Sequence, residues 1–224
     1  MTAHPPELIQ INHPTLPLTL RRGQVADAEL VVEAVQVSLP ELKRFLPWAH
    51  NPESVSVDFQ RARLATLREQ WEAKTGFCYN MLAEIPGHGL VVVGIIALHQ
   101  RRSPNPKAVE IGYWTRSGMS GQGICTRATQ AIVLVALEEL ALERVQILSD
   151  KTNVASLRVI EKVGFKREGL LRSNLPTSSE PQQAEGLVCS GDSWISSLIQ
   201  ADLAGLIWRN EFRSSMSFPS DDST

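Results

Sequence analysis

The chain has 224 residues, a formal net charge of −2 and a hydrophobic content of 43%. This length suits one large domain, and the chain has enough apolar side chains for a sizeable core. A net charge so near zero gives no indication of a nucleic-acid or membrane partner. The N-terminus lacks the basic and apolar segments of a secretory signal, and no run of 18 apolar residues exists, so we expect a cytoplasmic protein.

Cysteine and histidine residues do not follow a disulfide or metal-binding pattern. The three cysteines, Cys78, Cys125 and Cys189, are an odd number without a CxxC pair. This pattern favours reduced thiols over a disulfide framework or a zinc site. The five histidines form no HxxxH pair. We therefore expect no metal site.

The first part of the chain is predicted to hold an arm, a short strand and a helix. Residues 1–17 contain four prolines and little periodicity, which predicts an arm that lies on the surface or is partly disordered. Leu18–Leu20 alternates as a short strand. Asp27 can cap a helix whose apolar side chains, Leu30, Val31, Ala34 and Val35, fall on one side.

Two more helices are predicted before the main strands. A short helix is expected over Leu39–Ala49, with Leu42, Phe45 and Leu46 facing inward and Trp48 at its end. Asn51-Pro52 combines a capping residue with a proline for the first turn, so a third helix is expected to begin there and run to about Ala73.

Three strands are predicted next. Phe77–Glu84 alternates, and Leu90–Leu98 is a continuous apolar run that suits a central strand, with a turn at residues 86–89 between them. After a loop at Arg101–Pro106, Val109–Trp114 alternates β-branched and aromatic residues with other types. This last run is predicted to be a strand that ends near Trp114.

The rest of the chain predicts a parallel crossover. A helix face starts at Ile124, and Val145–Leu148 follows as a strand, so strand, helix and strand form a parallel unit. Asn153 can cap a further helix that Gly164 ends. The remaining predicted elements are a strand at Phe165–Leu171, a mobile loop at 172–190, a terminal helix around Leu203, Leu206 and Ile207, and a disordered tail at 214–224.

The glycines between the strand at Val109–Trp114 and the following helix predict an anion site. The first N–H groups of a helix lack intrahelical partners, and glycines allow a phosphate to approach the backbone. Gly121 and Gly123 stand at this point, although a bare GxG can also be a simple connection. The sequence contains no GxxxxGK[ST], and Gly118, Gly121 and Gly123 do not fit a dinucleotide fingerprint.

Four segments together carry a family resemblance. EIGYW, GQGI, NxxS and EKVGFKREG, in this order and spacing, resemble the GNAT superfamily of N-acetyltransferases and its RimJ/RimL branch, from about Leu18 to about Ile199. The resemblance implies an α/β (α+β) acyl-CoA N-acyltransferase fold, with a mixed, mostly antiparallel sheet that splays at the cofactor site and is flanked by helices. It also implies a last strand at Gly191–Ile199 and one domain at 18–213, between the arm 1–17 and the tail 214–224.

The resemblance implies acetyl-CoA as co-substrate and assigns residues to it. Backbone groups of Gly121, Gln122, Gly123, Ile124, Cys125 and Thr126 are expected to bind the pyrophosphate. Ser120 and Cys125 depart from the family pattern Q/R-x-x-G-x-G/A. The end of the strand, at Tyr113, Trp114 and Thr115, is expected to pair with the pantetheine arm. Asn153 is expected to hydrogen-bond this arm or to be only a helix cap, and Lys162, with Lys166 and Arg167, to approach the 3′-phosphate or to be only solvated.

The resemblance also implies the catalytic acid and the acceptor residues, and the strand at Val109–Trp114 supplies a candidate base. Ser156, three positions after Asn153, is the predicted acid for the leaving thiolate, or else an ordinary first-turn serine. Glu110 is the predicted base, because a carboxylate within a sheet either lines a cavity or pairs with a cation; a surface carboxylate is the alternative. Phe45 and Trp48 are expected to line the substrate groove, or to be core residues.

The sequence thus predicts an N-acetyltransferase that acts by direct transfer in a ternary complex. By likeness to RimJ/RimL, the expected acceptor is a protein N-terminal α-amine. An acetyltransferase of a small amine or antibiotic, a non-catalytic acyl-CoA-binding sensor and an uncharacterised structural domain are the alternatives. Dimers occur in this branch, so a homodimer is a further alternative.

Overall fold

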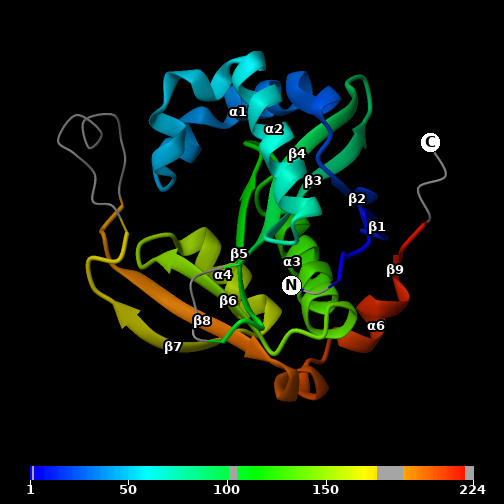
Figure 1. The fold of residues 1–224 in the computed structure, drawn as a ribbon, viewed down its shortest axis with the longest axis vertical. Coiled ribbons are helices and arrows are strands. Elements are labelled where there is room, and N and C mark those ends of the chain that lie inside the picture. Colours follow the sequence, from blue (N-terminus) through cyan, green and yellow to red (C-terminus); the bar gives the residue numbers. More distant parts are fainter. Residues whose placement is uncertain (2, 101–104, 176–188, 220–224) are drawn as a thin grey trace.

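Nine strands form one mixed sheet in the order β7-β8-β6-β5-β4-β3-β2-β1-β9 in the computed structural model, which describes residues 1, 3–100, 105–175 and 189–219 (Figure 1). The pair β5 and β6 is parallel, and the other adjacent pairs are antiparallel. The strands are β1 (Leu8–Ile11), β2 (Leu18–Arg22), β3 (Gly76–Ile85), β4 (Gly89–Gln100), β5 (Ala108–Thr115), β6 (Arg144–Asp150), β7 (Lys166–Leu171), β8 (Ser193–Ile199) and β9 (Met216–Ser217).

Five α-helices accompany the sheet in the described part of the chain. They are α1 (Ala28–Lys43), α2 (Val57–Glu72), α3 (Ile124–Leu134), α4 (Val154–Val163) and α6 (Arg209–Ser214). Among these described residues, no helix is long and apolar enough to cross a membrane. Nor do three or more His, Cys, Asp or Glu side chains gather there in a way that can hold a metal ion.

The two faces of the sheet pack against different helices because side chains alternate along each strand. In β4, Ile96 and Leu98 join the core that contains α3, whereas Ile95 and Ala97 join the core that contains Val31 of α1. The same alternation in β5 directs Val109, Ile111 and Tyr113 toward α3, and Trp114 toward α1. Helices α1 and α3 therefore lie on opposite faces of the sheet.

Both ends of the chain are more ordered than the sequence predicts. Residues 1–17 are not a surface arm, because Leu8–Ile11 forms β1 between β2 and β9, and Ile9 and Ile11 are fully buried. Met216–Ser217, placed in the predicted disordered tail, forms β9. Prolines near these short strands obscure the alternating pattern in the sequence. The strands themselves are stable only because they pair with neighbouring strands. Residues 220–224 of the predicted tail lie outside the described residues.

Several helix predictions are corrected. Leu39–Ala49 is not a separate helix: α1 continues through Pro40 to Lys43, and a short 3-10 helix follows at Pro47–His50. Asp27 precedes α1, but its carboxylate caps an adjacent 3-10 turn through Gln24 N. Asn51 caps another 3-10 turn, and Ser56 caps α2. The terminal helix around Leu203–Ile207 is a 3-10 turn at Gln200–Gly205, followed by α6.

The parallel crossover and the strands around it are confirmed. β5, α3 and β6 form the predicted unit, and Asn153 and Gly164 cap α4 at its two ends. Gly164 has a φ of +93°, where a side chain would be strained, and so it ends the helix. The predicted β7 and β8 are also present. Of the two predicted loops, residues 101–104 and 176–188 lie outside the described residues.

Candidate functional site

Strands β5 and β6 part at the position where the sequence predicts the cofactor. Their parallel register ends at the pair Glu110 and Gln146. Beyond it, β5 stays paired with β4 as far as Thr115, and β6 stays paired with β8 as far as Asp150. In the described part of the chain, the edge of β5 from Ile111 to Thr115 therefore lacks a ladder partner on its β6 side. Such a backbone edge requires water or a ligand as partner.

The glycine turn before α3 presents unpartnered backbone donors. Gly118, Gly121 and Gly123 all have φ values of +80° to +86°, the left-handed region that glycine adopts without strain. Among the described residues, none of the six backbone N–H groups from Gly121 to Thr126 donates a hydrogen bond. These six groups, called the amide cradle below, stand at the positive end of the α3 dipole and suit an anion.

A cavity of about 390 Å³ adjoins the amide cradle. It contains the predicted Lys162 together with side chains that the sequence analysis did not select: His13, Arg127, Gln130 and Trp208. The Gln130 Oε1 atom is buried and has no hydrogen-bond partner within the described ranges of the chain. Arg127 lies one helical turn after Gly123, a spacing that would have indicated it, but His13 and Trp208 come from distant segments and carry no local signal.

Lys166 and Arg167 are placed differently from Lys162. Lys166 forms an ion pair with Asp202, and Arg167 lies over the Trp194 ring at 4.5 Å. Neither side chain lines the cavity beside the amide cradle. Of these three predicted cations, Lys162 alone therefore reaches that cavity.

Ser156 and Tyr113 meet across the parted strands. The Tyr113 hydroxyl lies 2.9 Å from Ser156 Oγ, which connects the end of β5 with the first turn of α4. Asn153 Oδ1 accepts a hydrogen bond from Ser156 N at 3.1 Å and so caps this helix. Burial is the main cause that raises the pKa of Tyr113, and the neighbouring Cys125 adds to it. Tyr113 therefore stays a protonated hydroxyl at neutral pH.

Glu110 lies on the other face of β5 from Tyr113. Its side chain is 6% exposed, and Gln146 Nε2 donates to its Oε2 at 3.4 Å. His99 of β4 stands opposite Glu110 in the antiparallel register. The predicted acid and base are thus presented to opposite faces of the sheet, beside the place where β5 and β6 part.

The two predicted acceptor residues differ in their surroundings. Trp48 is 41% exposed, and its ring centroid lies 6.4 Å from that of Trp114 at the end of β5. It therefore borders the parted strands on the α1 face. Phe45 is half-buried, and its ring lies under the Arg44 guanidinium at 5.5 Å. Only Trp48 is placed against a predicted cofactor-binding residue.

Cys125, which departs from the family pattern, keeps a protonated thiol. Burial raises its pKa to about 12, although hydrogen bonds with Thr115 and Thr129 act in the opposite direction. A thiol with this pKa has almost no thiolate at neutral pH and is a poor nucleophile. Its backbone N–H remains part of the amide cradle.

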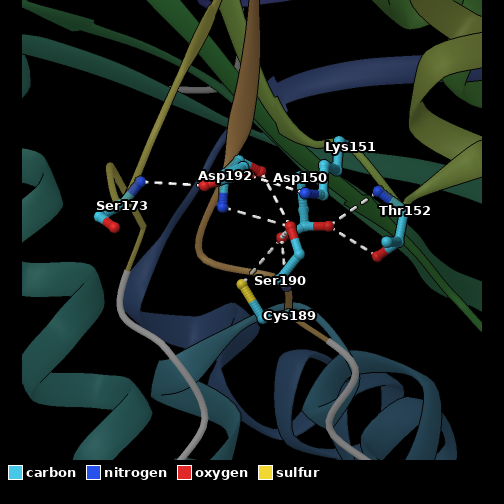
Figure 2. Close-up of polar contacts among 7 residues, drawn as sticks. All are labelled: Asp150, Lys151, Thr152, Ser173, Cys189, Ser190 and Asp192. Carbon is cyan, nitrogen blue, oxygen red and sulfur yellow. Dashed lines mark hydrogen bonds and ion pairs between the residues drawn. The ribbon is translucent and has the colours of Figure 1, made fainter.

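The buried carboxylate of Asp150, three residues before the cap of α4, was not identified from the sequence (Figure 2). Asp150, at the end of β6, accepts hydrogen bonds from Thr152 N and Oγ1 at 2.8 and 2.6 Å. It also accepts from Ser190 N and Oγ at 2.7 and 3.0 Å and from Cys189 Sγ at 3.2 Å. These partners lie about 40 residues away in the sequence, so no local pattern indicates them. Asp150 thereby fixes the turn that leads to Asn153.

Replacing Asp150 with Asn should lower the free energy of unfolding by about 2 kcal/mol at pH 7, because an amide donor would then face groups that also donate. Burial raises the pKa of the Asp150 carboxyl, but the hydrogen bonds from Thr152, Cys189 and Ser190 outweigh it and hold the pKa below its usual range. The carboxylate's stabilising contribution is therefore present above about pH 4 and is lost as pH falls through the folded-state pKa.

Thermal melts of both proteins from pH 7 to pH 3 measure this effect. The gap between wild type and D150N should be constant down to about pH 5 and should narrow below pH 4. Asp58→Asn is a matched control, because Asp58 is exposed on α2, where it pairs with the exposed Arg61. A gap that widens toward low pH would contradict this account of Asp150.

Comparisons with known proteins agree with this arrangement. The model of the acetyltransferase (GNAT) domain matches residues 17–166. YdaF of Bacillus subtilis (strain 168), provisionally named a ribosomal N-acetyltransferase, is 32% identical over 158 residues, which cover 70% of this chain and 82% of YdaF.

Two solved structures show the same fold at lower identity. Mycobacterium smegmatis RimJ in complex with CoA-disulfide superposes with a TM-score of 0.77 at 20% identity, over 97% of this chain and 100% of that one. The ribosomal-protein-S5-alanine acetyltransferase of Vibrio fischeri gives 0.72 at 19% identity, over 86% and 97%. The predicted fold and branch are confirmed: the chain belongs to the GNAT family of acetyltransferases, is similar to its RimJ/RimL branch, and is an N-acetyltransferase.

Proposed function

We propose that this enzyme transfers the acetyl group of acetyl-CoA directly to the α-amine of a protein N-terminus. The observation that carries the proposal is the amide cradle, six N–H groups without a partner among the described residues, beside the end of β5 where it leaves β6. A pyrophosphate matches these donors in charge and in hydrogen-bonding capacity.

The residues around the amide cradle fit the other parts of coenzyme A. The free edge of β5 from Tyr113 to Thr115 offers backbone groups for the amides of the pantetheine arm. The cavity beside the cradle carries Arg127 and Lys162, which suit the 3′-phosphate. The buried, unpartnered Gln130 Oε1 suits a donor such as an adenine amine.

Bound acetyl-CoA supplies an activated acetyl thioester. The carboxylate of Glu110 is buried on the acceptor face. It would accept a proton from the acceptor ammonium, directly or through water. Ser156 Oγ would donate a hydrogen bond to the leaving sulfur from the other face. The raised pKa of Cys125 supports direct transfer, since this thiol cannot readily form an acyl-enzyme.

The names of similar proteins support a peptide acceptor. YdaF is provisionally named for ribosomal acetylation, and the Vibrio fischeri enzyme is named for acetylating the alanine of ribosomal protein S5. Trp48 and Trp114 offer an aromatic wall on the acceptor face, which a peptide can contact beyond its terminal amine. A small amine or antibiotic would have less to bind along such a wall.

A binding and turnover experiment tests the proposal. Isothermal titration with acetyl-CoA should give saturable binding, and thiol release should depend on an added amine. Peptides with ribosomal-protein N-termini should exceed polyamines and aminoglycosides in kcat/KM. Binding without release from any acceptor would support the sensor alternative, faster turnover of the small amines would move the acceptor to that class, and absence of binding would refute the proposal.

Replacing Glu110 with Gln should lower kcat/KM by about 10-fold at pH 7, because the proton acceptor is lost while the side-chain volume is kept. Glu84→Gln is the matched control, because Glu84 is exposed at the end of β3. An E110Q enzyme with an unchanged kcat/KM would exclude Glu110 as the base.

A further inference from the structure

His13, in the N-terminal segment that follows β1, contacts the backbone of the amide cradle. It follows β1 by two residues, is 6% exposed, and places its Nε2 atom 2.9 Å from the carbonyl oxygen of Gln122. The Asn12 N–H donates to Ser215 O, so β1 and the segment before β9 hold His13 in place. This contact spans 109 residues of sequence and is absent from every motif that the sequence analysis used.

The surroundings of the imidazole determine which nitrogen carries the proton. The backbone N–H groups of Thr15 and Leu16 both donate to Nδ1, at 3.4 and 3.2 Å. Nδ1 therefore carries a lone pair, and in the neutral ring the proton lies on Nε2. His13 thus donates to the Gln122 carbonyl, and its two nitrogens have separate roles: one orders the local turn and the other holds the glycine turn.

This hydrogen bond fixes the orientation of a peptide group in the cradle. The Gln122–Gly123 peptide is planar and trans, so the Gln122 C=O and the Gly123 N–H point in opposite directions. The backbone torsions of Gly121 and Gly123, on either side of this segment, can take a wide range of values. The local sequence alone therefore does not hold the Gln122–Gly123 peptide in one orientation. With its carbonyl held by His13, the Gly123 N–H is directed away from His13.

We propose that His13 is a positioning residue for the pyrophosphate of coenzyme A. By holding the Gln122 carbonyl, it keeps the Gly123 N–H available to the anion and lowers the ordering cost of binding. The inference rests on the proposed function, because it assigns a pyrophosphate to the amide cradle. In this role His13 donates no hydrogen bond to the ligand and acts only through the Gln122–Gly123 peptide group.

Two substitutions separate the roles of the two ring nitrogens. In His13→Asn, the amide oxygen can replace Nδ1 as acceptor, but no donor reaches Gln122. In His13→Gln, the longer side chain can place its amide N–H near the former Nε2 position. We expect H13N to raise the Kd for coenzyme A about 5- to 10-fold, as expected for one lost hydrogen bond, and H13Q to stay within about 2-fold of wild type.

Isothermal titration with coenzyme A under reducing conditions gives the Kd, and thermal melts establish that each variant is folded. With acetyl-CoA varied, H13N should raise KM and leave kcat at saturation unchanged. An H13N protein that binds as tightly as wild type would overturn the inference. So would equal losses in H13N and H13Q, since they would point to the ring itself.

A second ligand distinguishes positioning of the cradle from direct contact with the 3′-phosphate. Coenzyme A and 3′-dephospho-coenzyme A both contain the pyrophosphate, so H13N should weaken both by the same factor. Lys162→Ala, as a comparison, should weaken coenzyme A more than the dephospho form. A loss in H13N that is confined to coenzyme A would overturn the inference. If wild type binds neither ligand, it is the proposed function that fails.

Discussion

Replacing Ser156 with Ala is expected to lower kcat by about 10²-fold, which corresponds to about 2.7 kcal/mol of transition-state stabilisation. The hydroxyl lies in the first turn of α4, and the Tyr113 hydroxyl is 2.9 Å from it. The phenol of Tyr113 is protonated at neutral pH, and burial raises its pKa further. Its proton can go to Ser156 Oγ or to the Ser156 carbonyl oxygen at 3.4 Å. When it goes to Oγ, the Ser156 proton is available for the leaving sulfur. The measurement is steady-state kinetics at saturating acetyl-CoA.

Tyr113→Phe tests the same pair from its other side. It should lower kcat less than S156A does, and the double variant should resemble S156A, because Tyr113 acts through Ser156. Ser214→Ala is a matched control: its hydroxyl donates to Glu211 O within α6 and is exposed. A kcat for S156A within 2-fold of wild type would exclude Ser156 as the acid.

Replacing Gly94 with Ala is expected to destabilise the protein by about 3 kcal/mol, the second large effect. Gly94 pairs with Thr115 where β4 meets the end of β5, next to a register shift between Met81 and Leu82. An added Cβ would lie 2.3 Å from Met81 Cε and 2.4 Å from the Trp114 carbonyl oxygen. The methionine side chain can move, but the Trp114 backbone cannot move without disturbing the ladder.

Thermal unfolding measures the effect of G94A, and a decrease in Tm of about 10 °C is expected for a chain of this size. Since Trp114 lies on the free edge of β5, the KM for acetyl-CoA should also rise. Gly169→Ala is the control, because Gly169 lies in β7 and a Cβ there would meet nothing within 4 Å. A G94A protein that melts within 2 °C of wild type would contradict this prediction. It would show that the backbone of β5 can move away from the added methyl group at little cost.

The locally encoded parts of the fold were predictable. Asn153 and Gly164 mark the ends of α4 because a cap and a left-handed residue act within one turn. The alternation of β5 and the glycines before α3 likewise predicted strand, turn and helix. The prediction failed at Pro40, which usually ends a helix. There α1 continues, because Val35, Ser38 and Leu42 keep one buried face on both sides of the proline.

Side chains joined through tertiary contacts were not predictable. His13 meets Gln122, and Asp150 meets Ser190, only after the sheet has brought separate segments together. The alternation of β5 places Tyr113 and Glu110 on opposite faces of the sheet, but no periodicity shows that Tyr113 meets Ser156.

By itself, the sequence determined the family, the order of the central elements and the glycine turn that begins α3. The family rests on four short motifs and their order along the chain. The other two features depend on residues within a few positions of one another, where torsion preferences and capping act directly. The tertiary structure alone decided that Leu8–Ile11 and Met216–Ser217 join the sheet as β1 and β9, and that the amides of the cradle find no partner in the described part of the chain. These properties depend on which strand edges lie side by side, and that is fixed only when the whole core is buried at once.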